Sequence, residues 1–290
     1  MRKLFASRNA RLFFALVAAI LPFGWITLAS ADSLTTFVSG RGADSGTCAS
    51  PTSPCRTFQF ALGVTKPGGE IKALDPANYG RVDVGQSVSI TGIEGASIDV
   101  INGHGISVSA GATDVVNISN VTFDGHSSAN YGLIFTKAGS LNINNCAFRN
   151  FASHGIFIQP PTGTTSFRIA DVVASDNGGS GFYFLAQNSA LTNGVLERVR
   201  LNHNANGVYA TRSSNSAKLN MVVSSSAATN NQSIGFLSGA QGTFLIRNSV
   251  ATGNVYGLYL NTVCASAGDN ILYGNTSSNI LGGCSAVSPN

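Results

Sequence analysis

A short glycine-led segment recurs seven times between residues 105 and 260, and this repeat constrains the fold more than any other feature. The segments are GISV at 105, GLIF at 132, GIFI at 155, GFYF at 181, GVYA at 207, GFLS at 235 and GLYL at 257. Successive glycines are 27, 23, 26, 26, 28 and 22 residues apart. Each period holds short β-forming runs and no stretch long enough for a regular helix. A unit this small cannot bury its own apolar face, so it must stack on its neighbours.

An asparagine gives the repeat a second, independent marker. It ends the strand-like stretch before a repeat glycine at Asn150, Asn177, Asn204, Asn231 and Asn254, with spacings of 27, 27, 27 and 23 residues. Stacked side-chain amides can hydrogen-bond as a ladder along the stacking axis. No Leu-x-x-Leu-x-Leu motif recurs, which excludes a leucine-rich repeat, and the period is too short for a propeller blade. The sequence therefore predicts an all-β parallel β-helix, in which coils stack about 4.8 Å apart.

The repeat resembles that of the pectate-lyase-like superfamily of secreted right-handed parallel β-helix proteins, over most of the chain. This resemblance implies a right-handed β-helix and identifies no specific enzyme family. A more local resemblance covers TFVSGRGADSGTCASPTSPCRTFQFAL, residues 36–62, which looks like the N-terminal segment of some β-helix polysaccharide lyases. It implies a short N-terminal capping helix over 56–64, whose Phe58, Ala61 and Leu62 cover the open end of the core.

The first 31 residues have the pattern of a secretory signal peptide. An apolar run from Leu12 to Leu28 ends in the small-residue site Ala29-Ser30-Ala31 and follows four cations: Arg2, Lys3, Arg8 and Arg11. We expect cleavage after Ala31, a secreted or periplasmic location, and no membrane partner after cleavage. A retained membrane anchor is the alternative, and the Pro22, Gly24 and Ala-Ser-Ala features argue against it.

Removal of this segment leaves a chain with no net charge. All 13 Asp and Glu follow Ala31 but only 17 − 4 = 13 Lys and Arg do, so the mature net charge is 13 − 13 = 0. This balance gives no support for a nucleic-acid partner.

No Pro-rich or charged linker divides the remaining 290 − 31 = 259 residues. We therefore predict one β-helix domain over 32–290, with an N-terminal cap at 32–70, coils over about 71–262 and a C-terminal cap at 263–290.

Five cysteines in an exported chain indicate disulfides with one thiol left over. Cys48 and Cys55 flank a short loop, and Cys264 and Cys284 bracket the C-terminal segment, so we predict these two pairs. Cys146 lies inside a repeat and is predicted to be a buried thiol that acts as a small core residue.

The triplet Gly103-His104-Gly105 resembles the Gly-His-Gly motif of polygalacturonases. The residue before each repeat glycine varies freely, however, and reads His104, Tyr131, His154, Ser180, Asn206, Ile234 and Tyr256. The Asn-Thr-Asp, Asp-Asp and Arg-Ile-Lys motifs of that family are absent. Glycoside hydrolysis needs paired carboxylates at the scissile bond, and only Glu94 and Asp99 lie near in sequence. The sequence therefore argues against a hydrolase role for His104.

Two columns of polar residues accompany the marker asparagines. The residues just before the asparagines are Arg149, Asp176, His203, Asn230 and Gly253. The residues at the position six before each asparagine are Asn144, Asp171, Arg198, Ser225 and Asn248. Stacked on consecutive coils, the charged members would supply the cation and the base of a polysaccharide lyase or uronate epimerase. The competing interpretation is that alternating charge on solvated turns avoids like-charge stacking.

A metal site finds little support in these columns. Calcium needs several convergent carboxylates, as in pectate lyases, and only Asp171 and Asp176, with Asp124 from an earlier coil, could converge. The sequence therefore predicts no cofactor and no metal ligands, and leaves Ca²⁺ without support.

The second residue after each repeat glycine forms an outward column, because its neighbours at the first and third positions are almost all apolar. The column reads Ser107, Ile134, Phe157, Tyr183, Tyr209, Leu237 and Tyr259. Apolar sugar faces can stack on such rings, which makes Phe157, Tyr183, Tyr209 and Tyr259 candidate ligand-binding residues. A loop, the C-terminal tail or a second subunit covering the stripe is the alternative.

Three hypotheses follow for the function. The leading one is an exported β-helix protein that binds polysaccharide or another glycan along its outer face, with catalysis left open. The second is a polysaccharide lyase or uronate epimerase using Arg149, Asp176, His203, Asp171 and Arg198. The third is a structural or adhesive surface protein that oligomerises through the aromatic stripe.

Overall fold

The computed structural model describes residues 33–260, 264–283 and 285–287. The signal peptide predicted at residues 1–31 and Cys284 lie outside these ranges, so neither signal cleavage nor the Cys264–Cys284 disulfide can be compared with the structure. Within the described ranges, no helix is both long and apolar enough to cross a membrane.

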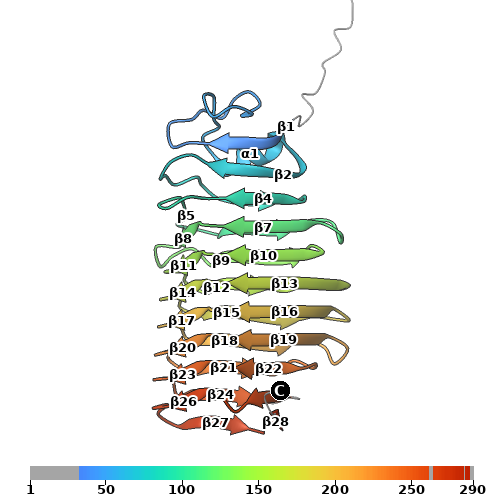
Figure 1. Cartoon of the computed structure of the whole chain (residues 1–290), viewed down its shortest axis with the longest axis vertical. Helices are drawn as coiled ribbons and strands as arrows, with labels where there is room; N and C mark the ends of the chain where they lie inside the picture. The colour runs from blue at the N-terminus through green and yellow to red at the C-terminus, as the bar shows by residue number, and fades with distance from the viewer. Residues whose placement is uncertain (1–32, 261–263, 284, 288–290) are drawn as a thin grey trace, which may run out of the picture. The chain divides into compact units, whose positions relative to one another are not determined.

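The chain winds as a stack of coils, and each complete coil contributes one strand to each of three parallel sheets (Figure 1). Within the described ranges, sheet A contains β1 (Ser33–Val38), β2 (Thr65–Ala73), β4 (Val88–Thr91), β7 (Val115–Ser119), β10 (Ser140–Asn144), β13 (Thr164–Ala170), β16 (Leu191–Glu197), β19 (Lys218–Ser224), β22 (Phe244–Arg247), β25 (Cys264–Ala267) and β28 (Ser285–Val287). Sheet B contains β5 (Ser97–Asp99), β8 (Thr122–Asp124), β11 (Ala147–Arg149), β14 (Val173–Ser175), β17 (Arg200–Asn202), β20 (Ala227–Thr229), β23 (Val250–Thr252) and β26 (Ile271–Tyr273). Sheet C contains β3 (Val82–Val84), β6 (His104–Ser109), β9 (Tyr131–Lys137), β12 (His154–Ile158), β15 (Ser180–Ala186), β18 (Asn206–Arg212), β21 (Ile234–Ser238), β24 (Tyr256–Leu260) and β27 (Ser278–Gly282). The predicted parallel β-helix is confirmed.

The N-terminal end of the core is covered by the only helix in the described ranges, α1 (Phe58–Val64). Thr57 caps this helix, because its side chain accepts a hydrogen bond from the backbone N–H of Phe60. Phe58, Ala61 and Leu62 are buried, as the sequence predicts. A disulfide joins Cys48 to Cys55 in the preceding loop, with Cα atoms 5.3 Å apart, which confirms that predicted pair.

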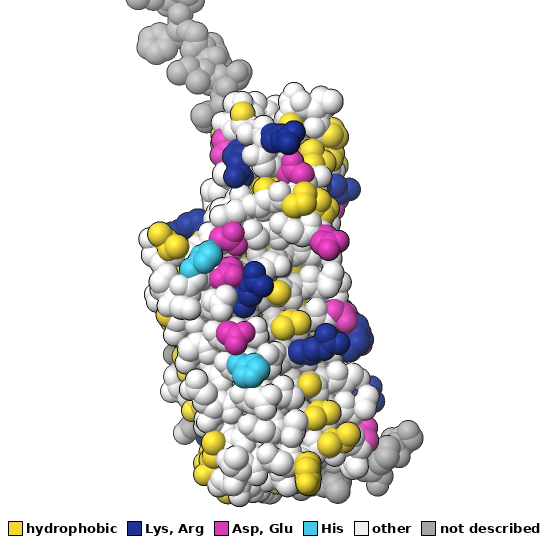
Figure 2. Space-filling view, turned by 90° about the vertical axis from the view of Figure 1, so that its left-hand side faces the viewer, with side chains coloured by type: hydrophobic (Ala, Val, Ile, Leu, Met, Phe, Trp, Pro, Cys, Tyr) yellow, Lys and Arg dark blue, Asp and Glu magenta, His cyan; other side chains and the backbone are white. Residues whose placement is uncertain are grey.

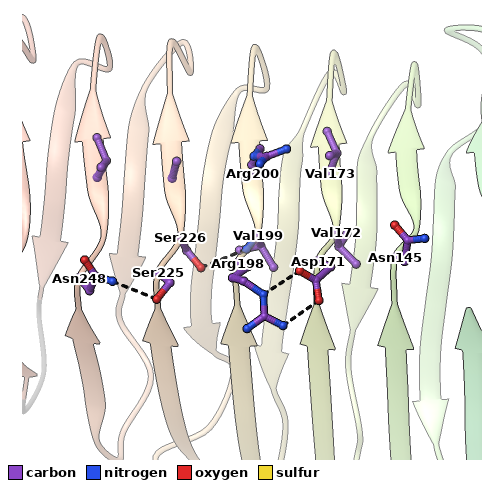
Figure 3. Close-up of a pocket in the computed structure, with 12 residues that line it drawn as sticks. Asn145, Asp171, Val172, Val173, Arg198, Val199, Arg200, Ser225, Ser226 and Asn248 are labelled. Carbon is purple, nitrogen blue, oxygen red and sulfur yellow. Dashed lines mark hydrogen bonds and ion pairs between the residues drawn. The ribbon is translucent and has the colours of Figure 1, made fainter. Parts of the chain in front are cut away.

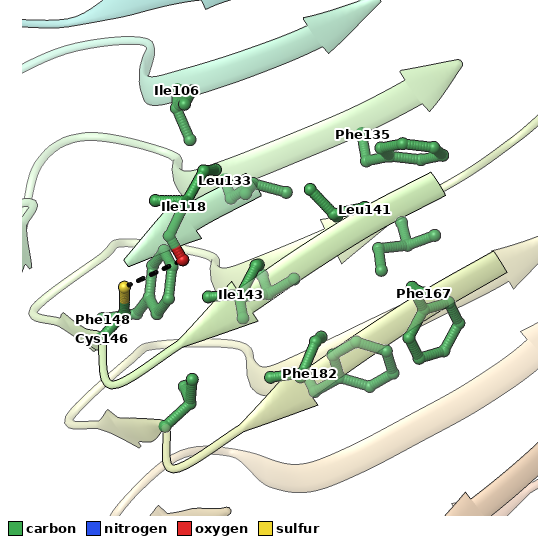
Figure 4. Packing of buried hydrophobic residues seen from close by; sticks show 14 of the residues in the cluster. Ile106, Ile118, Leu133, Phe135, Leu141, Ile143, Cys146, Phe148, Phe167 and Phe182 are labelled. Atoms are coloured by element: carbon green, nitrogen blue, oxygen red, sulfur yellow. Dashed lines mark hydrogen bonds between the residues drawn. The ribbon is translucent and has the colours of Figure 1, made fainter. Parts of the chain in front are cut away.

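The core is built by the first and third residues after each repeat glycine, together with the inward residues of sheets A and B. In sheet C the first of these positions is at most 2% exposed in every coil from β6 to β24: Ile106, Leu133, Ile156, Phe182, Val208, Phe236 and Leu258. Side chains from the sheets meet in the interior (Figure 4), where Phe123 and Phe148 stack with ring centroids 4.4 Å apart. Cys146 is buried, as predicted, and burial raises its thiol pKa to about 12.

The corner between sheets A and B is turned in six consecutive coils by a residue with left-handed backbone conformation. These residues have φ between 44° and 59° and are Asn120, Asn145, Asp171, Arg198, Ser225 and Asn248. The corner between sheets B and C uses a second left-handed position, occupied by Asn150, Asp176, His203, Asn230 and Gly253, with φ between 54° and 70°. Asn, Asp and His adopt this conformation more readily than most residues, so the backbone accounts for much of both polar columns.

A ladder of buried asparagines follows the second corner. Asn177 donates from Nδ2 to Oδ1 of Asn204, Asn204 to Asn231, and Asn231 to Asn254, at 2.8, 3.2 and 2.9 Å. The predicted ladder is thus confirmed for these four residues, and Asn275 extends it. Asn150 was predicted to belong to the ladder, but it occupies the left-handed turn position one residue earlier. The buried Phe151 takes the ladder position in that coil, and its N–H donates to Oδ1 of Asn177.

Candidate functional site

An elongated depression runs along the corner between sheets A and B, and we call it the corner groove (Figure 3). It consists of two hollows of about 500 and 580 Å³, which are continuous because they share Asn145, Asp171 and Val173. One wall is the left-handed column Asn120, Asn145, Asp171, Arg198, Ser225 and Asn248, and the floor is Thr122, Ala147, Val173, Arg200, Ala227 and Val250. From Gly92 to Asn248 the groove passes six strand spacings, or about 29 Å.

A network of ion pairs lies on the wall of this groove. Arg198 binds both carboxylate oxygens of Asp171 on the preceding coil, with Nε–Oδ1 and Nη2–Oδ2 distances of 2.7 and 2.8 Å. Arg198 also donates to Glu197, which accepts a second hydrogen bond of 2.5 Å from Arg168. The sequence placed Asp171 and Arg198 in one column on consecutive coils, and the pairing bears this out.

These contacts set the protonation states in the groove. The Arg198 hydrogen bond holds the pKa of Asp171 below its usual range, and hydrogen bonds from Arg168 and then Arg198 do the same for Glu197. The two carboxylates in turn raise the pKa of Arg198. All of these groups are therefore charged at neutral pH, and each carboxylate is a weaker base than a free one. The network suits holding a guanidinium in place better than abstracting a proton.

Arg200 differs from its neighbours because, within the described residues, its guanidinium has no hydrogen-bond or ion-pair partner. It stands on the groove floor, where the residues paired with it on the two adjacent strands are Val173 and Ala227. Both are too short to cover a guanidinium. The sequence pattern does not single out Arg200, although its position two residues after a left-handed turn residue repeats along the column.

The opposite edge of sheet B carries a second charged cluster. Figure 2 faces this sheet and shows charged and histidine side chains at several places along its length. Arg149 forms an ion pair of 2.8 Å with Asp124, which is 8% exposed and also accepts hydrogen bonds from the His126 N–H and from Asn150. Burial alone would raise the pKa of Asp124, but these hydrogen bonds and the nearby guanidinium hold it below its usual value.

The sequence predicted that Arg149, Asp176 and His203 stack on three consecutive coils, and this prediction is wrong for Arg149. Arg149 pairs in register with Asp124 and Ser175, one position short of Asp176. The cause is the misplaced Asn150, which shifted that coil by one residue. Asp176 and His203 do occupy the same exposed left-handed position on consecutive coils, but within the described residues no hydrogen bond or ion pair joins them. Similarly, Asn144 pairs with Ala170, so Asn145 is the residue equivalent to Asp171.

The carboxylates of these columns do not fit a calcium ion. Asp171 and Asp176 lie at opposite ends of β14, and Asp124 is engaged by Arg149. In the described ranges, no group of three or more His, Cys, Asp or Glu side chains could hold a metal. Calcium in proteins takes six or more oxygen ligands, and these separated carboxylates cannot provide them.

The residues two positions after the repeat glycines stack in register on sheet C, although Phe157 and Leu237 among them are buried. Phe157 pairs with Tyr183, and Tyr183 with Tyr209, on consecutive strands, with ring centroids 4.9 and 5.5 Å apart. Tyr131 and His154 from the position before the repeat glycine pack against this row, with Tyr131–Phe157 and His154–Tyr183 centroid distances of 5.3 and 4.6 Å. We call these five residues the aromatic cluster. Tyr259 lies apart from the cluster, beside Tyr256.

The members of the cluster differ in exposure. Phe157 is 7% exposed because its neighbours enclose it, whereas Tyr131, Tyr183 and Tyr209 are half-buried and keep part of each ring open to solvent. Phe157 therefore supports the tyrosines rather than offering a surface of its own. Tyr131 and His154 were not predicted as members, although both occupy the position before a repeat glycine, as His104 does.

His154 is neutral under ordinary conditions. Burial lowers its pKa to about 4, and Nδ1 accepts a 2.9 Å hydrogen bond from the backbone N–H of Ser180, which leaves the proton on Nε2. Burial and the neighbouring tyrosines raise the pKa of Tyr183. The aromatic cluster is thus an uncharged surface at neutral pH. His104 lies outside it, with Nε2 3.3 Å from a carboxylate oxygen of Asp83.

Comparisons with known proteins agree with this architecture. The family described as "Right handed beta helix region" matches residues 81–220. Among solved structures, the crystal structure of pectate lyase Pel9A is similar, with a TM-score of 0.58 and 16% sequence identity, over 88% of this chain and 77% of that chain. No curated protein matches the sequence. The fold of this chain is therefore that of a right-handed parallel β-helix, similar to the fold of pectate lyase Pel9A.

Proposed function

We propose that this is an exported polysaccharide-binding protein whose contact surface is the aromatic cluster on sheet C. The observation that carries the proposal is the unbroken series of ring contacts from Tyr131 to Tyr209 across four consecutive coils. The apolar faces of sugars stack on aromatic rings. Because the rings already hold one another in place, a ligand loses little affinity to ordering them.

The uncharged state of the cluster supports a glycan over a charged partner. Neutral His154 and the protonated tyrosines present ring faces and hydroxyl groups, which are the complements of sugar C–H faces and hydroxyls. The rings of the cluster follow the strand spacing, so a linear glycan lying along the stack would meet at least one aromatic residue on each of the four coils.

The test is a double variant, Tyr183→Ala with Tyr209→Ala, measured by affinity electrophoresis in gels that contain a panel of neutral and acidic polysaccharides. Loss of two stacking contacts should weaken retardation roughly tenfold or more on every neutral polysaccharide that retards the wild type. Tyr273→Ala is the matched control, because Tyr273 is 77% exposed on β26 and lies outside the cluster. Unchanged retardation of the double variant, or a wild type retarded by none of the panel, would contradict the proposal.

Export is part of this proposal. The signal-peptide pattern of residues 1–31 supports it, and so does the Cys48–Cys55 disulfide, since disulfides persist mainly in oxidising compartments. The intact mass of the purified native protein should correspond to a chain that begins at Asp32. A product that retains Met1 and stays in the cytoplasm would rule export out.

A polysaccharide lyase or uronate epimerase is the second candidate, because Asp171 and Arg198 line an elongated groove. It ranks second because these groups are paired with one another. Incubation with pectate and alginate, with and without Ca²⁺, should produce unsaturated products that absorb in the ultraviolet if the protein is a lyase. Complete absence of absorbance on both polymers counts against the lyase version, and unchanged uronate stereochemistry counts against the epimerase.

A further inference from the structure

We infer that the corner groove is a second ligand site, separate from the aromatic cluster, and that it takes a linear polysaccharide bearing anionic groups, with Arg200 contacting the carboxylate or sulfate.

The shape of the groove fits a linear polymer. Its two hollows join into one channel along the stacking axis, about 29 Å long, whereas a compact ligand would need an enclosed pocket. Apart from Arg200, the floor carries only Thr, Val and Ala side chains, so a polymer chain can lie along it beside the guanidinium.

The walls offer hydrogen-bonding groups along most of this length. Asn145 donates from Nδ2 to Oδ1 of Asn120 at 2.7 Å, and Asn248 donates to Oγ of Ser225 at 3.1 Å. Each of these pairs uses only part of its capacity, because an amide carries two donor hydrogens and an oxygen with two lone pairs. Exposed amides and hydroxyls repeated at the strand spacing can bind the hydroxyls of a polymer with a similar repeat.

The charges select an anionic ligand. The local charge is positive, because three arginines and two carboxylates leave an excess of 3 − 2 = 1. They are Arg168, Arg198 and Arg200, and Asp171 and Glu197. Both carboxylates are already bound by Arg168 and Arg198, so the unsatisfied guanidinium is that of Arg200. The planar guanidinium fork matches the paired oxygens of a carboxylate or sulfate. Glu94 lines the far end of the groove, about four strand spacings away, where the charge is screened at physiological salt.

The experiment uses one linear backbone in three forms: hydroxyethyl cellulose, carboxymethyl cellulose and cellulose sulfate, each cast into native gels. The wild type should be retarded more by the carboxymethyl or sulfated gel than by the neutral one. Arg200→Ala should lose roughly tenfold in affinity on the charged polymer and change little on the neutral polymer. Arg200→Lys should fall between the two, because it keeps the charge and loses the fork. Whichever of the two anionic gels depends more on Arg200 identifies the anionic group.

Arg247→Ala is the control for net charge, since Arg247 is exposed at the end of β22 and does not line the groove. If Arg200→Ala and Arg247→Ala have equal effects, or if the wild type does not distinguish the charged gels from the neutral gel, the inference is wrong. The Tyr183→Ala and Tyr209→Ala variant should keep the Arg200-dependent preference. Failure of this site and failure of the aromatic cluster therefore give different results, and thermal unfolding of each variant excludes a loss of folding.

Discussion

Arg198 and Asp171 occupy the same left-handed turn position on consecutive coils, and the Arg198 guanidinium donates hydrogen bonds of 2.7 and 2.8 Å to the two carboxylate oxygens of Asp171. These two residues are 27 positions apart in the sequence, so the stacking of one coil on the next brings them together. The pair illustrates how a β-helix converts a sequence period into a row of contacts, and how a charged residue can occupy a backbone position that usually favours Asn, Asp or Gly.

Replacement of Arg198 by Asn should change the stability little. The variant loses an exposed ion pair, which contributes little in water, and gains a residue better suited to the left-handed conformation. Arg198→Val loses the same pair and places a β-branched residue at positive φ, so its melting temperature should be lower than that of Arg198→Asn. Thermal unfolding of both variants checks this order. A larger loss for Arg198→Asn would mean that the ion pair outweighs the backbone preference.

The Asp124–Arg149 pair should make stability depend on acid pH. The folded pKa of Asp124 is lowered from its reference value of 3.8, so its contribution is fully present above about pH 4 and is lost as the pH falls through the lower folded value. Asp124→Asn should cost about 1 to 3 kcal/mol at pH 7, because it weakens contacts to a buried acceptor. The difference from wild type should shrink between pH 4 and pH 2. Urea unfolding at several pH values measures it, and a constant difference would contradict the lowered pKa.

The fold could be predicted because its two strongest signals, the glycine period and the alternation of apolar residues, follow directly from burial in a stack. The glycine period predicted the register of sheet C in every coil, whereas the register of the turns could be predicted only where Asn177, Asn204, Asn231 and Asn254 fix it. Asn150 misled the alignment because asparagine suits both the left-handed turn and the ladder, and Phe151 replaces the amide in that coil. The turn conformation also accounts for the residue types of Asp176 and His203, and their catalytic role stays a prediction.

The aromatic cluster was foreseen only in part for a similar reason. A period gives the residues of one column, but Tyr131 and His154 reach Phe157 and Tyr183 from a different column by diagonal packing between coils. The enclosure of Phe157 also depends on ring positions, which no spacing reveals. Arg200 could not be recognised as unpaired until Asp171 and Glu197 were seen to be bound by its neighbours.

The asparagine ladder should contribute strongly to stability. Asn204→Leu keeps a similar volume but removes the acceptor for the N–H and Nδ2 of Asn177 and the donor to the Ala174 carbonyl. Leaving these buried groups without partners should cost about 3 kcal/mol or more. Asn220→Ala is the control, since Asn220 is exposed on sheet A and bonds only Asn193 and the backbone of Thr243. Its cost should stay below about 1 kcal/mol, and equal costs for the two variants would mean that the buried ladder is dispensable.

The repeat glycines should be intolerant of a methyl group, because consecutive coils approach closely at these positions. A Cβ built on Gly207 would lie 2.4 Å from the carbonyl oxygen of Gly235 and 2.9 Å from Cβ of Ala228. Gly207→Ala must therefore separate two paired strands, which should cost about 1 to 3 kcal/mol or more by overpacking. Gly63→Ala is the control, since Gly63 lies in α1 with no atom within 4 Å of the added Cβ, and alanine favours a helix. Urea unfolding should show Gly207→Ala destabilised and Gly63→Ala equal to or more stable than wild type; a Gly207→Ala protein as stable as wild type would show that the coils can move apart without cost.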